Sequence, residues 1–104
     1  MKKDPEVALE VAKIFKLIKG ISPGKAVELR VPPYGAIQCG NGVVHRRGIP
    51  ANQVEMNAVI LIHLAINPES WSVLMGQGQV RASGLASDLS KLFTQVSAEY
   101  QAGI

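Results

Sequence analysis

The chain has 104 residues, a length that fits one domain and leaves little for a second, so we expect a single domain over residues 1–104. Hydrophobic residues make up 47% and charged residues 18% of the chain, which excludes the disordered class. The net charge of +3 permits contact with an anionic lipid surface or with nucleic acid but requires neither.

The cellular compartment is predicted from the cysteine count and from the length of the apolar segments. One cysteine cannot form an internal disulfide, which agrees with a reducing environment. The longest apolar run, at residues 58–62, is too short to span a bilayer. We therefore expect a cytoplasmic protein.

The first predicted element is a helix that begins at Asp4 and ends at Gly20. Asp4 is of the type that caps helices, and Pro5 suits the first helical position. Apolar residues at helical spacing form one stripe that we expect to face a sheet: Val7, Val11, Ile14, Phe15 and Ile18.

Alternating apolar and polar residues predict strands next. The first ends at Pro32-Pro33, since proline cannot donate to a ladder. Asn41-Gly42 is a strong hairpin signal, and the register it implies puts Cys39 and His45 on opposite faces. The five predicted strands cover residues 27–31, 36–39, 43–47, 54–56 and 80–82.

Helices dominate the second half. Residues 58–66 read as a helix capped by Asn57, although a buried strand would look similar; the cap favours the helix. Asn67 can end it in a left-handed conformation, and a short helix with Trp71 follows. A long last helix is predicted from Leu85 to Tyr100. The fold class is thus α+β: a mainly antiparallel sheet of about five strands with helices on one face.

Catalytic and metal sites find little support. Cys39 and His45 could act as nucleophile and base, but a small buried thiol on a core strand is the commoner role of a free cysteine. His63 interrupts an apolar helix, where it is more often a polar break or a group at a cavity mouth than a ligand. No metal-ligand spacing occurs. We expect no enzyme activity, no metal and no cofactor.

The only compact basic cluster outside the first helix is His45-Arg46-Arg47. A solvated strand face is the simpler interpretation, and contact with a carboxylate or phosphate headgroup is the alternative. Nucleic-acid binding would need aromatic residues among the basic ones, but aromatic residues are only 5% and none adjoins the cluster. We expect no nucleic acid as partner.

Several segments resemble sterol carrier protein domains. They are Val54-Glu55-Met56-Asn57, a short apolar helix, Trp71 on the next helix, the stretch Gly76 to Gly84, and Asp88-Leu89. The chain is still more similar to the short stand-alone sterol-carrier-like proteins of actinobacteria, through Arg30-Val31-Pro32-Pro33-Tyr34, Gln38-Cys39 and the pattern of His45, Arg47 and Gly48. The resemblance runs from Gly24 to Phe93. Asn57 and Asn67-Pro68 depart from the family's usual Asp and Gly.

The resemblance implies an apolar tunnel between sheet and helices that carries a fatty acyl, sterol or isoprenoid-like lipid without chemistry. The hypothetical headgroup contacts are His45, Arg46, Arg47 and His63, and transfer would involve an anionic membrane surface. The alternative is a protein-interaction or accessory module with a filled core, which binds a partner protein or pairs with itself as a dimer. The hypothetical apolar wall consists of Val59, Ile62, Ile66, Trp71, Leu74, Met75, Leu89, Leu92, Phe93 and Val96.

Overall fold

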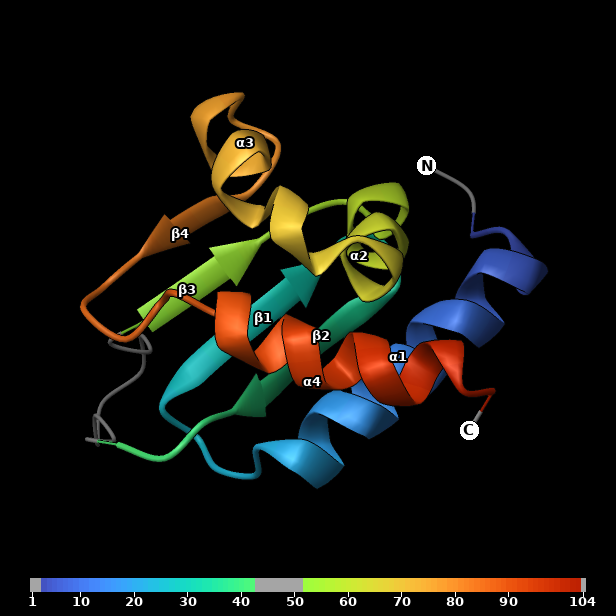
Figure 1. The fold of residues 1–104 in the computed structure, drawn as a ribbon, viewed down its shortest axis with the longest axis horizontal. Coiled ribbons are helices and arrows are strands. Elements are labelled where there is room, and N and C mark those ends of the chain that lie inside the picture. The colour runs from blue at the N-terminus through green and yellow to red at the C-terminus, as the bar shows by residue number, and fades with distance from the viewer. Residues whose placement is uncertain (1–2, 43–51, 104) are drawn as a thin grey trace.

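The computed structural model describes residues 3–42 and 52–103. Figure 1 shows α4 crossing in front of the sheet, with α1 and α2 on either side of it. In chain order the elements are α1 (Pro5–Ile21), β1 (Val27–Val31), β2 (Gly35–Cys39), β3 (Asn52–Glu55), α2 (Ala58–Ile66), a 3-10 turn η1 (Pro68–Ser70), α3 (Trp71–Gly76), β4 (Arg81–Ser83) and α4 (Ser90–Gln101).

The sheet corrects the sequence prediction. Within the described residues it has four strands, not five, in the order β2-β1-β3-β4. β1 pairs antiparallel with β2, and β3 with β4, but β1 and β3 run parallel. A hairpin signal such as Asn41-Gly42 predicts only the pairing of strands that are consecutive in the chain. It therefore could not predict that β3 pairs with β1 on the side opposite to β2. The expected strand 43–47 and its pairing lie outside the described residues.

One face of the sheet is buried and the other is open. In β1 the side chains of Val27, Leu29 and Val31 are buried, whereas Glu28 and Arg30 alternate with them on the open face. This period-2 pattern requires helices to cover one side only. The predicted α+β layering, with helices on one face, is confirmed.

The predicted helix starts are confirmed at two caps. The Oδ1 atom of Asp4 accepts hydrogen bonds from the backbone N–H groups of Glu6 and Val7, at 2.8 and 3.2 Å. Asn57 Oδ1 accepts from Ile60 N–H at 2.9 Å, so residues 58–66 form the helix α2 and not a buried strand. Asn67 ends α2 with φ of −127°, so the left-handed conformation predicted for it is wrong.

The last helix begins five residues later than predicted. Leu85 stands in a turn after Gly84, whose φ is +101°, and its side chain is fully exposed at 107%. Asp88 Oδ1 accepts from the backbone N–H of Ser90 at 2.9 Å, which marks the true start of α4. Leu85 has helical spacing in the sequence, but the positive φ of Gly84 and the hydrogen bond to Asp88 place the start of the helix after it.

The core lies between the sheet and the three longer helices. Its fully buried large side chains include Ile14 and Ile18 from α1, Leu61 and Leu64 from α2, and Phe93 from α4. The Phe93 and Trp71 rings have centroids 6.0 Å apart. Among the described residues, no helix has the length and apolarity needed to cross a membrane.

Candidate functional site

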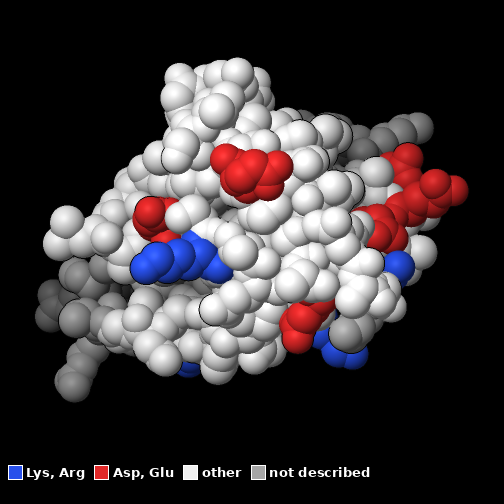
Figure 2. Space-filling model, viewed as in Figure 1, with Lys and Arg blue, Asp and Glu red and all other residues white. Residues whose placement is uncertain are grey.

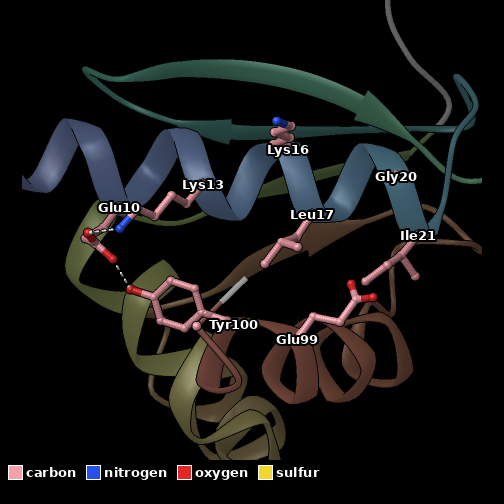
Figure 3. A pocket seen from close by; sticks show the side chains of 9 residues that line it. Glu10, Lys13, Lys16, Leu17, Gly20, Ile21, Glu99 and Tyr100 are labelled. Carbon is pink, nitrogen blue, oxygen red and sulfur yellow. Dashed lines mark hydrogen bonds and ion pairs between the residues drawn. The ribbon is translucent and has the colours of Figure 1, made fainter.

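A cleft of about 770 Å³ lies between α1 and the end of α4 (Figure 3). Its volume falls within the roughly 300–1,000 Å³ typical of small-ligand sites. From α1 it is lined by Glu10, Lys13, Lys16, Leu17, Gly20 and Ile21, and from the end of α4 by Glu99, Tyr100 and Gly103.

Helical spacing explains why these α1 residues share the cleft. Glu10, Lys13, Leu17 and Gly20 follow one another at intervals of three or four residues, which places them in a second stripe beside the buried one. Gly20 contributes no side chain, and a Cβ atom built there meets nothing within 4 Å. The missing side chain therefore leaves part of the space open.

The cleft has an apolar floor and a charged rim. Leu17, Ile21 and the Tyr100 ring are half-buried, while Lys13 and Lys16 are exposed. Figure 3 shows Leu17 and Ile21 directed from α1 toward α4. Long lysine side chains lay their methylene stems along apolar surface and keep the ammonium group in water. The arrangement suits a ligand with an apolar body and a polar end.

A polar contact closes one end of the cleft. The Tyr100 hydroxyl donates a hydrogen bond to Glu10 Oε1, and Lys13 Nζ lies 3.2 Å from Glu10 Oε2. The Tyr100 hydrogen bond, and then Lys13, lower the pKa of Glu10. Burial, together with the Glu10 hydrogen bond, raises the pKa of Tyr100 to about 12. At neutral pH the carboxylate is thus ionised and the phenol neutral.

The end of α4 is also tied to α2. Gln101 Nε2 donates to the backbone carbonyl of Ile66 at 2.9 Å and to Ser97 Oγ. Further along α4, Phe93 and Val96 are fully buried in the core. The wall of the cleft that α4 provides is therefore held from three sides, by α1, by α2 and by the core.

None of the ten residues of the sequence-predicted wall lines this cleft. Val59, Ile66 and Met75 point outward, and Ile62 and Leu92 are half-buried. The other five pack in the core with the buried residues of the sheet: Trp71, Leu74, Leu89, Phe93 and Val96.

The polar candidates are scattered. His63 is exposed on α2, where its Nε2 lies 3.1 Å from Ser70 Oγ, away from the cleft residues. His45, Arg46 and Arg47 lie outside the described residues. Cys39 is fully buried, and burial raises its pKa, as expected for the structural thiol favoured from the sequence. No group of three or more metal-binding side chains occurs in the described part of the chain.

Sequence reasoning missed most of the cleft. Tyr100 was predicted only as the last residue of the final helix, and Lys13 and Lys16 lie outside the apolar stripe predicted for the first helix. Leu17 and Ile21 fall outside the main apolar stripe of α1, so the helical periodicity does not indicate them as part of a site. The available signal was the second stripe of α1, in which an apolar pair follows a charged pair at helical spacing.

The comparisons with known proteins agree with this fold. The family model described as "Bacterial SCP ortholog", SCP standing for sterol carrier protein, matches residues 4–94. A solved structure named "UbiJ-SCP2 Ubiquinone synthesis protein" is similar, with a TM-score of 0.52 and 14% identity over 96% of this chain and 97% of that one. No curated protein matches in sequence. The chain belongs to the family of bacterial sterol carrier protein orthologues.

Proposed function

We propose that this protein is a non-catalytic lipid carrier of the cytoplasm and that it holds one apolar chain in the cleft between α1 and α4. The observation that carries the proposal is the combination of an apolar floor with a charged rim, made of two lysines and two glutamates, at the junction of two helices. Membership of the sterol carrier family supports lipid binding in general. The similar solved structure is named as a ubiquinone synthesis protein, so isoprenoid chains belong among the ligands to test.

The dimensions of the cleft favour a linear ligand. Ile21 lies eleven positions after Glu10, and a rise of 1.5 Å per residue gives a span of about 16.5 Å along α1. An extended alkyl or prenyl chain follows such a span with its side against Leu17 and Ile21. At its polar end the chain would meet the Glu10–Tyr100 contact and the lysines of the rim.

The deeper apolar wall takes part only if α4 moves. Leu92, Phe93 and Val96 are half-buried or fully buried behind the helix, so a ligand reaches them after α4 has loosened from α1. The ties that oppose this movement are the Tyr100–Glu10 and Gln101–Ile66 hydrogen bonds. We propose that loosening occurs at an anionic membrane surface, drawn by the lysines of α1.

A bulky side chain at Gly20 tests the site directly. Gly20 lines the cleft and lies inside α1, and an added Cβ meets no neighbour, so Gly20→Trp fills the space without a backbone clash. Titration calorimetry with a long-chain fatty acid and with a prenyl alcohol should show binding by the wild type. For Gly20→Trp we expect at least a tenfold loss of affinity.

Gly76→Trp is the matched control. Gly76 lies at the end of α3, does not line the cleft, and also has no neighbour within 4 Å of an added Cβ. Both variants should retain the wild-type circular dichroism spectrum, and Gly76→Trp should bind normally. Equal binding by Gly20→Trp and Gly76→Trp would place the ligand elsewhere.

A second candidate function is a protein-interaction module. Val59 on α2 is 71% exposed and Val73 on α3 is 60% exposed, and Ile66 and Met75 are exposed as well. Figure 2 shows the projecting α3 region without charged side chains. Exposed apolar surface of this kind is common at protein contacts. Concentration-dependent dimerisation of the ligand-free protein, abolished by Val73→Lys, would favour this function.

A further inference from the structure

The segment from Ser70 to Val80, which contains α3, has no charged residue. The nearest charged residues in the chain are Glu69 and Arg81, one at each end of the segment. Figure 1 shows that α3 projects from the rest of the molecule, and Figure 2 shows this projecting lobe without charged side chains. The lobe therefore offers a binding partner no charge with which to form an ion pair.

The two faces of α3 differ in burial. Trp71 and Leu74 are buried, and the Trp71 ring packs near that of Phe93 in the core. Val73 and Met75, on the same short helix, are exposed. The inner face thus holds α3 firmly in place while the outer face presents apolar side chains, so a contact there costs little ordering entropy.

The last carbonyl groups of α3 are satisfied by the turn that follows the helix. The Leu74 carbonyl accepts a hydrogen bond from Gln79 N–H at 2.9 Å. The Met75 carbonyl accepts one from Gly78 N–H at 3.1 Å, and the φ of Gly78 is +73°, as a helix-ending glycine of this kind requires. Carbonyl groups at a helix end otherwise depend on water. Because these two do not, this end of α3 can leave water with little cost from its backbone.

The shape and neutrality of the lobe favour a lipid surface over a second protein chain. In the described part of the chain, the cleft and two smaller hollows are each lined by charged side chains, among them Glu10, Lys25 and Arg81. None of these three hollows in a second copy matches an uncharged lobe. A bilayer needs no matching hollow, because its headgroup region adapts to an apolar surface that enters it.

From these observations we infer that α3 docks the protein on a lipid bilayer, with Val73 and Met75 at the boundary between headgroups and acyl chains. Insertion is shallow, since Glu69 and Arg81 bound the uncharged segment. The contact is apolar, so it requires no anionic lipid and persists at high salt. The inference goes beyond the proposed function, because it names a membrane-binding face distinct from the lysines of α1.

Flotation with phosphatidylcholine vesicles tests the inference. We expect the wild type to float with the vesicles equally well at low and high salt. Val73→Asp should lower the vesicle partition coefficient by at least about fivefold, because a carboxylate replaces an apolar side chain at the boundary. Leu9→Asp is the matched control: Leu9 is 64% exposed on α1, close to the 60% of Val73, and this variant should float like the wild type. Both substitutions fall on exposed residues, so both variants should retain the wild-type circular dichroism spectrum.

Equal flotation of the wild type and Val73→Asp, or an equal loss for Leu9→Asp, would overturn the inference. Flotation that requires phosphatidylserine and disappears at high salt would also overturn it, since the lysines of α1 would then make the contact. An absence of flotation would overturn it as well, and dimerisation abolished by Val73→Asp would then assign the lobe to a second copy. Val73 does not line the cleft, so Val73→Asp should bind a long-chain fatty acid normally in calorimetry, and the proposed function is tested separately.

Discussion

Truncation of Phe93 tests how α4 is held in place. The side chain is fully buried, and its ring centroid lies 6.0 Å from that of Trp71. A buried phenylalanine removes roughly 200 Å² from water, which at about 25 cal/mol per Å² gives an upper bound of about 5 kcal/mol. Phe→Ala substitutions in cores cost about 3–5 kcal/mol. We therefore expect Phe93→Ala to lower the free energy of unfolding by about 4 kcal/mol.

Urea unfolding followed by circular dichroism measures this loss. A domain of this size has a total stability of about 5–15 kcal/mol, so Phe93→Leu, with an expected loss of about 1 kcal/mol, covers the case in which the alanine variant does not fold. Val73→Ala is the control; because Val73 is largely exposed, its effect should stay within about 0.5 kcal/mol. A loss below about 1.5 kcal/mol for Phe93→Ala would refute the reasoning, since such a small cost means that the ring faces a tunnel and not a packed core.

Four further outcomes are expected. Tyr100→Phe should lower the free energy of unfolding at neutral pH by removing the hydrogen bond to Glu10. That bond lowers the pKa of Glu10, so its contribution is present above pH 4.5 and is lost as the pH falls through the folded-state pKa; acid unfolding of the variant should therefore be less pH-dependent than that of the wild type. Ultraviolet titration should show one phenol, absent from the variant, that ionises near pH 12. Gly20→Ala should raise stability by about 0.5 kcal/mol in urea unfolding, since glycine is unfavourable inside a helix. Asn57→Ala should lower the free energy of unfolding by about 1 kcal/mol, because the hydrogen bond that caps α2 is lost. An unchanged free energy of unfolding would show that this cap does not stabilise the protein.

Local signals in the sequence predicted local structure well. Asp4 and Asn57 each placed the start of a helix, because a side-chain oxygen at this position satisfies backbone donors of the first turn. The alternation in residues 27–31 predicted a half-buried strand. The resemblance to sterol carrier domains, carried by motifs such as Val54-Glu55-Met56-Asn57, agrees with the family to which the chain belongs.

These local signals could not predict contacts between segments that are far apart in the chain. The parallel pairing of β1 with β3 depends on the path of the chain, and side-chain alternation is the same for both strand directions. The cleft depends on how α1 meets the end of α4, two helices at opposite ends of the chain. Leu17 and Tyr100 line the same cleft only because these two helices pack together, so residue spacing in the sequence could not predict that they share a site.

Native mass spectrometry of freshly purified wild-type and Gly20→Trp proteins, paired with lipid extraction from the same samples, tests the central claim most directly. We predict that the wild type carries a mass excess of one lipid, matched by an extracted acyl or isoprenoid chain, and that Gly20→Trp carries none. The same mass excess in both proteins would contradict a site between α1 and α4. A bare wild-type mass, with no uptake of added fatty acid, would contradict the carrier function itself.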